Sequence, residues 1–97
     1  MYLYIIYSVS RDRHYIGETS NVETRVQQHN TGYFKSSSTA GATDWTPVLI
    51  IHCGDRSKAR QVEAFLKRQR NREFLVRFIY DEPYRSTLLG ERFGIHT

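Results

Sequence analysis

The sequence predicts an α+β domain in which a small antiparallel three-stranded sheet is flanked by helices. Three stretches are rich in aromatic and β-branched residues, at 2–8, 14–18 and 45–53. Segments with capping residues and apolar residues at helical spacing separate and follow them. The 97 residues, 39% of them apolar, suffice for one domain with a modest core. The expected order of elements is β-β-α-β-α-α.

The first two strands form a hairpin. Residues 2–8 (YLYIIYS) are followed by the short polar turn 10–13, and residues 14–18 (HYIGE) supply the return strand. Tyr4 and Tyr15 would face the same side of the sheet in one of the possible registers, and the sequence does not fix the register.

A helix follows the hairpin, and a long loop follows the helix. Ser20 and Glu23 have the spacing of a capping box, with Ser20 as the N-cap. The helix is expected to extend to about Asn30, before Gly32. Residues 31–44 are rich in Gly, Ser and Thr and are longer than a connection usually requires, which favours a functional loop.

The second half of the chain predicts one strand and two helices. Residues 45–53 (WTPVLIIHC) form the most hydrophobic stretch and are expected to be a central strand, with Pro47 near its beginning. A helix from 58 to about 68 would bury Val62, Phe65 and Leu66, and a second helix would run from about 71 to 80. We expect Pro83 to end it.

The expected division is a domain over residues 1–82 and a C-terminal tail over 83–97, either docked or flexible. Leu88 and Leu89 suggest a docked segment or a contact with a partner. The single cysteine, Cys53, excludes an intrachain disulfide and a Cys-rich zinc site. No apolar run is long enough to span a bilayer, so no membrane partner is expected. A cytoplasmic location is the expectation.

Basic residues are concentrated in one region. The net charge is +4, and eight Lys or Arg residues lie between 56 and 77 against two glutamates. Such a distribution favours polyanionic partners, although a solvated helix face has the same pattern.

Several polar residues are candidates for chemistry. Glu63 is the one carboxylate between 56 and 72 and lies beside the expected core stripe, so it is either an ion-pair partner or a metal ligand. Arg25 and His29 lie one turn apart on the first helix. Tyr4 and Tyr15 are equally compatible with packing. None of these residues alone indicates an activity.

Their ordered combination resembles the GIY-YIG endonuclease superfamily. Tyr15-Ile16-Gly17 is similar to the second half of its signature, and Tyr2-Leu3-Tyr4 keeps the last tyrosine of the first half. Arg25 and His29-Asn30 are similar to its helix motif, and Glu63-x-x-Leu66-Lys67 to the motif with the metal-binding glutamate. Among its members, the chain most resembles the small stand-alone bacterial proteins of the UPF0213 (YhbQ-like) type.

This resemblance implies a divalent-metal-dependent endonuclease. Glu63 would hold one Mg²⁺ or Mn²⁺ ion. Arg25 would pair with the scissile phosphate, and Tyr4 would act as general base or position the attacking water. Tyr15 would bind the phosphate, and His29 would relay a proton or orient Tyr4. Glu18 and Asn71 have no assigned role, and Glu18 either joins the metal site or repels substrate.

The expected substrate is DNA, cut with low sequence specificity in repair, recombination or DNA uptake. Phosphates would be bound by basic residues of the second half and of the loop: Lys35, Lys67, Arg68, Arg70 and Arg72. A homodimer or a protein partner would supply any specificity. Two alternatives stay open, a catalytically silent nucleic-acid-binding module of the same fold and a small homodimeric interaction protein.

Overall fold

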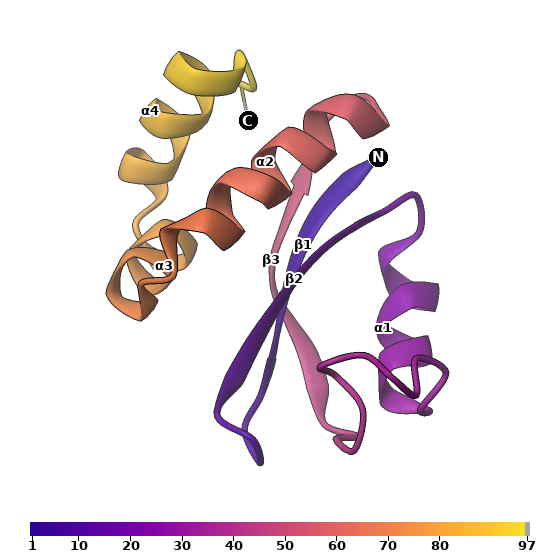
Figure 1. The fold of residues 1–97 in the computed structure, drawn as a ribbon. Coiled ribbons are helices and arrows are strands. Elements are labelled where there is room, and N and C mark those ends of the chain that lie inside the picture. Colours follow the sequence, from indigo (N-terminus) through magenta and orange to yellow (C-terminus); the bar gives the residue numbers. More distant parts are fainter. Residues whose placement is uncertain (97) are drawn as a thin grey trace.

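The computed structural model describes residues 1–96. Across these residues three strands and four helices follow one another in the order β-β-α-β-α-α-α, which confirms the predicted α+β class and adds one helix (Figure 1). They are β1 (Tyr2–Ser8), β2 (Arg13–Thr19), α1 (Val22–Asn30), β3 (Trp45–His52), α2 (Arg56–Gln69), α3 (Arg72–Tyr80) and α4 (Glu82–Phe93). Within this part of the chain, no helix is both long enough and apolar enough to cross a bilayer.

The sheet is antiparallel with the strand order β2-β1-β3, so β1 is the central strand. The prediction that residues 45–53 form the central strand is therefore wrong, because β3 lies at an edge. β1 is buried on both faces, and each residue from Leu3 to Ile6 is at most 1% exposed. Pro47 has no N–H to donate and lies where the β1–β3 register shifts, a position that an edge strand tolerates.

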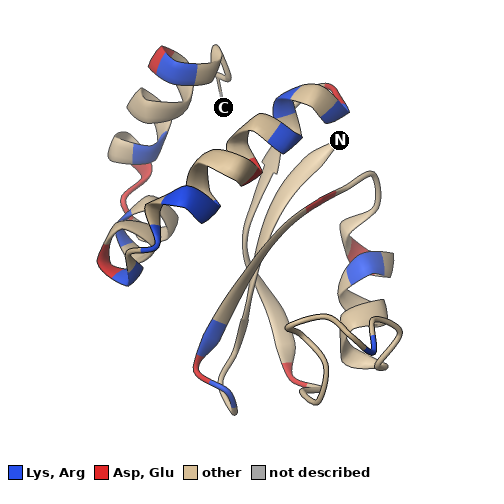
Figure 2. Cartoon of the chain, in the orientation of Figure 1, with Lys and Arg blue, Asp and Glu red and all other residues tan. Residues whose placement is uncertain are grey.

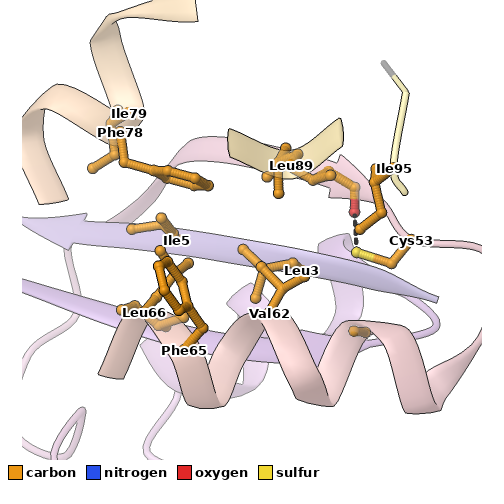
Figure 3. Close-up of a cluster of buried hydrophobic side chains, with 13 residues drawn as sticks. Leu3, Ile5, Cys53, Val62, Phe65, Leu66, Phe78, Ile79, Leu89 and Ile95 are labelled. Atoms are coloured by element: carbon orange, nitrogen blue, oxygen red, sulfur yellow. Dashed lines mark hydrogen bonds between the residues drawn. The ribbon is translucent and has the colours of Figure 1, made fainter. Parts of the chain in front are cut away.

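The alternation of β1 gives the sheet two different faces. Leu3 and Ile5 point into the main core, which α2, α3 and α4 supply with most of its other members (Figure 3). The predicted inward residues Val62, Phe65 and Leu66 are among them, and all three are buried. Tyr4 and Ile6 point to the other face and pack with Trp45, Val22 and Val26, so α1 covers this face (Figure 1).

The N-terminus of α1 differs from the prediction by one residue. Asn21 rather than Ser20 is the N-cap, and its side chain accepts a hydrogen bond from the Thr24 amide at 3.1 Å. The Thr19 hydroxyl binds the backbone of Asn21 and fixes it in an extended conformation. Asn and Ser are equally good caps, and the sequence offered both in succession.

Pro83 begins a helix instead of ending one. α3 already stops at Tyr80, and the Asp81 side chain caps α4 by accepting from the Tyr84 amide at 3.1 Å. Proline is favourable in the first turn because the amide it lacks would have no partner there. Leu89 of α4 is fully buried in the main core, and Ile95 beyond the helix joins the same core (Figure 3).

Candidate active site

Tyr4 lies on the α1 face of the sheet with its ring over the neighbouring strand. In the hairpin it is opposite Gly17 of β2. A Cβ atom at residue 17 would lie 2.6 Å from both Cζ and the hydroxyl oxygen of Tyr4. Glycine is therefore required at position 17 because the phenol occupies the space of a side chain. The Tyr4 ring therefore extends over β2, the edge strand that α2 also contacts.

A buried chain of hydrogen bonds starts at the Tyr4 hydroxyl. It lies 2.9 Å from Nε2 of His29, and Nδ1 of His29 lies 2.7 Å from Oγ1 of Thr39. The Thr39 hydroxyl donates onward to Ser37 at 3.2 Å, so its oxygen is free to accept from Nδ1–H. Nε2 of His29 is then the acceptor for the Tyr4 proton. Tyr4, His29 and Thr39 are all at least 98% buried.

Thr39 is part of this hydrogen-bond chain, and the sequence did not single it out. It lies in the loop of residues 31–44, whose unusual length was the available signal. The Trp45 indole donates to the Thr39 carbonyl at 3.1 Å and holds this part of the loop against the sheet. The side chain of Asn30 binds both the amide and the carbonyl of Trp45, at 2.7 and 2.9 Å. Two anchors therefore fix the loop that carries Thr39.

Tyr15 lies on the same face as Tyr4. It is opposite Ile6, so the register that the sequence left open places both tyrosines towards α1. Its ring centroid is 4.8 Å from that of His29 and 6.3 Å from that of Tyr4. Tyr15 is partly exposed whereas Tyr4 is buried. Its ring therefore forms part of the accessible wall of the site.

Arg25 completes the α1 side of the site. Its guanidinium carbon lies 5.4 Å above the ring of Phe34, whose centroid is 4.7 Å from His29. Burial raises the pKa of Tyr4 well above its usual value. The charges of Tyr15 and Glu63 raise it further, whereas Arg25 lowers it. Burial, followed by Arg25, lowers the pKa of His29 to about 4. At neutral pH, Tyr4 is thus a phenol and His29 a neutral imidazole.

Glu63 faces the site from α2. Its side chain is 21% exposed, and it accepts a hydrogen bond from the Lys67 ammonium at 2.8 Å. The same ammonium lies 5.6 Å from the centroid of the Tyr15 ring. No group of three or more His, Cys, Asp or Glu side chains suited to a metal occurs among residues 1–96. A single carboxylate fits Mg²⁺, which keeps several waters and takes further oxygens from a substrate phosphate.

Two polar residues left without a role in the sequence analysis, Glu18 and Asn71, lie outside this site. Glu18 points to the other face of the sheet, where Arg56 and Arg60 of α2 each approach it at 3.7 Å. These distances exceed a hydrogen bond, and the buried Oε2 atom has no hydrogen-bond partner. Asn71 caps α3 by accepting from the Phe74 amide at 3.1 Å. The role of Asn71 is therefore local.

The five basic residues predicted to bind nucleic acid do not form one group. Lys67, Arg70 and Arg72 line a depression of about 300 Å³ between α2, α3 and the hairpin. Arg13, which was not predicted, lines it as well. Figure 2 shows these basic positions at the end of α2, the start of α3 and the hairpin. Arg68 is exposed outside the depression, and Lys35 is exposed on the loop after α1.

Comparison with known proteins finds one matching family and similar relatives. The family described as "GIY-YIG catalytic domain" matches residues 1–75. The chain is 40% identical over 55 residues to "Structure-specific endonuclease subunit SLX1" of Homo sapiens, which is 52% of this chain and 20% of that protein. It is 48% identical over 44 residues to the Xenopus laevis protein of the same name, 43% of this chain and 16% of that one. No solved structure matches the chain.

The chain spans about a fifth of the length of these curated relatives, both of which are eukaryotic and neither of which is a small bacterial stand-alone protein. The matched family region runs from β1 into α3 and contains Tyr4, Tyr15, Arg25, His29 and Glu63. The chain therefore belongs to the GIY-YIG catalytic domain family.

Proposed function

We propose that this domain is a divalent-metal-dependent endonuclease that hydrolyses DNA phosphodiesters. The observation that carries the proposal is the buried Tyr4–His29 hydrogen bond at 2.9 Å, which is adjacent to Arg25 and within electrostatic reach of Glu63. A phenol with an imidazole can handle the proton of an attacking water, a guanidinium can stabilise the phosphate charge, and a carboxylate can hold a metal ion.

Glu63 would hold one Mg²⁺ or Mn²⁺ ion together with water and phosphate oxygens. When bound, the ion would polarise the scissile phosphate and stabilise the leaving oxygen. The Lys67 ammonium lies 2.8 Å from the Glu63 carboxylate, so this carboxylate already binds a cation. Binding of a divalent ion would release Lys67 towards the substrate phosphates.

Tyr4 and His29 would accept and transfer the proton of the attacking water. Because its pKa is high, Tyr4 is protonated and donates its proton in the hydrogen bond to Nε2 of His29. A lone pair of the phenol oxygen is then available to accept a proton from water. As the water attacks phosphorus, Tyr4 would take the water proton and pass its own proton to Nε2 of His29. Thr39 would keep the Nδ1–H form of His29, which leaves Nε2 available for this transfer.

Arg25 and Tyr15 would bind the phosphate that reacts. The guanidinium is held above Phe34, which leaves its N–H groups able to pair with phosphate oxygens as negative charge develops. Tyr15 is partly exposed on the same face, so its hydroxyl can donate to the same group.

We infer that sequence specificity is low. Lys67 and Arg70 would contact phosphates, which carry no sequence information. The relatives are named structure-specific endonuclease subunits, which supports a nucleic-acid substrate and a partner that supplies further recognition. A homodimer would serve in the same way. Repair, recombination and DNA uptake in the cytoplasm remain the proposed settings.

The test is cleavage of labelled single-stranded, duplex and branched DNA in Mg²⁺, Mn²⁺ or EDTA by wild type and by Glu63→Ala. We expect metal-dependent cleavage by wild type and a loss of at least a hundredfold in the variant, because the variant lacks the carboxylate that we propose holds the ion. Glu73→Ala, on the exposed surface of α3, is the matched control. Absence of cleavage by wild type with salt-sensitive binding retained would instead indicate the silent binding module.

A further inference from the structure

Two depressions adjoin each other between the hairpin and the helices α2 and α3. The first, of about 300 Å³, is lined by basic residues that include Arg13, Lys67 and Arg70. The second, of about 260 Å³, is lined by Tyr7, His14, Arg72, Val76 and Tyr80. His14 and Arg72 line both, so the two depressions lie side by side, and together they are called the groove.

The first depression is basic and leads away from the candidate active site. Lys67 lies above Tyr15 and binds Glu63, so the groove begins where that site ends. The negative charge in its wall is Asp12, which is already paired with both terminal nitrogens of Arg72 at 3.1 and 2.5 Å. Arg13 and Arg70 are exposed and are left to attract an anion.

Aromatic side chains make up most of the lining of the second depression. Tyr80 is 70% exposed and Val76 38% exposed, and both belong to α3. The rings of Tyr7 and His14 line the same depression from the hairpin, with centroids 4.7 Å apart and planes tilted by 43°. Burial, followed by the charge of Arg72, lowers the pKa of His14, so this ring is neutral at physiological pH. The aromatic side chains of the second depression thus lie beside the basic residues of the first.

The walls of the groove are fixed before any ligand binds. The Tyr7 hydroxyl donates to Asp12 at 2.5 Å, and Asp12 in turn holds Arg72. This network ties the tip of the hairpin to the first turn of α3. Asp12 neutralises the charge of Arg72, and Glu63 neutralises that of Lys67. Arg13 and Arg70 therefore supply the net positive charge of the groove.

We propose that this groove binds a single-stranded segment of nucleic acid, with phosphates in the basic depression and an unpaired base stacked on Tyr80 in the aromatic one. The proposal rests on the nuclease function of the adjoining site. Single strands are bound by positively charged grooves with aromatic side chains on which bases stack. A base in the interior of a duplex has both faces covered by its neighbours and cannot use such a surface.

The test measures binding in EDTA, where no cleavage occurs, by fluorescence anisotropy of a labelled single strand and a blunt duplex. Wild type is compared with Tyr80→Phe, which keeps an aromatic ring, and Tyr80→Ser, which removes it. We expect Tyr80→Ser to bind the single strand about tenfold more weakly, with Tyr80→Phe close to wild type. Duplex affinity should stay unchanged in both variants. Tyr80 is exposed, and a thermal unfolding curve verifies that each variant folds.

A second measurement reports the stacked base directly. A single strand containing 2-aminopurine should lose fluorescence on binding to wild type and to Tyr80→Phe, and should keep it with Tyr80→Ser. Equal single-strand affinity in wild type and Tyr80→Ser, or equal weakening of duplex binding, would overturn the proposal. Cleavage is measured separately, so a wild type that cuts DNA but shows no stacking refutes the groove and leaves the nuclease function intact.

Discussion

The Tyr4–His29 pair depends on a third residue, Thr39, for the form of the imidazole. Because the Thr39 oxygen accepts from Nδ1–H, the opposite nitrogen is kept as the acceptor for the phenol. Thr39→Val removes the acceptor with little change of volume and should lower kcat about tenfold to a hundredfold. Thr39→Ser should restore most of the activity.

A measurement by ¹⁵N NMR of His29 separates this positioning role from a structural one. We expect the Nδ1–H tautomer in wild type and in Thr39→Ser and a mixture of tautomers in Thr39→Val. An unchanged tautomer together with unchanged kcat in Thr39→Val would show that Thr39 does not position His29.

Gly17 permits the position of the Tyr4 ring. Alanine at residue 17 would place Cβ 2.6 Å from the phenol, so the ring must move and the bond to His29 must lengthen. We expect Gly17→Ala to lose about 1–3 kcal/mol of unfolding free energy in urea, together with most of the activity. Gly90→Ala is the control, because its nearest contact is the exposed His96 ring at 3.4 Å. Equal stability of the two variants would contradict this account.

At the scale of elements, Asn30 joins the end of α1 to the start of β3. Its amide makes two hydrogen bonds to the backbone of Trp45, fifteen residues away, and thereby closes the loop that carries Thr39. Asn30→Ala should cost about 1–3 kcal/mol because the Trp45 groups lose their partners.

Hydrogen exchange locates the effect of this substitution. Amides of residues 31–44 should exchange faster in Asn30→Ala, whereas Asn21→Ala, which removes the N-cap at the other end of α1, should leave the loop unchanged. The same exchange rates in both variants would mean that Asn30 does not anchor the loop.

The elements that the sequence predicted well are those whose signals are local. The hairpin followed from aromatic and β-branched runs, and α2 from the apolar spacing of Val62, Phe65 and Leu66. Strand order is not local: residues 45–53 are the most hydrophobic stretch, yet β1 is central because both of its faces are covered. Helix α4 was not predicted because Pro83 is compatible with both the end and the start of a helix.

The residues of the site were predictable as a set, and their geometry was not. Tyr4, Arg25, His29 and Glu63 were identified from their order along the chain. The structure joins Tyr4 to His29 by a hydrogen bond, and the charges of Arg25 and Glu63 both act on the pKa of Tyr4. The register that turns Tyr15 towards His29 and the bond from Thr39 to His29 depend on tertiary packing, which spacing does not encode.

For the whole molecule, burial of neutral His29 predicts acid sensitivity. Its folded pKa of about 4 lies below the ordinary value of 6.5, so the unfolded state binds a proton that the folded state does not. Stability should therefore fall as pH drops from about 6.5 to 4, by roughly 3 kcal/mol. His14 is lowered in the same direction and adds to the same window.

Unfolding in urea at several pH values checks this window. His29→Gln, which removes the titrating group, should flatten most of the slope between pH 6.5 and 4. The carboxylates Asp12 and Asp44, with pKa values of about 2, lose their contributions only below pH 4 and fall outside it. An equally steep slope in His29→Gln would contradict the assignment.

The central claim is that side chains from β1, α1 and α2 form one catalytic unit. Single-turnover cleavage by Tyr4→Phe, Glu63→Gln and the double variant tests it most directly. If the residues act together, each single change lowers the rate at least about a hundredfold and the double variant is no slower than the worse single variant. Losses that multiply in the double variant, or metal-dependent cleavage that survives in Glu63→Gln, would contradict it.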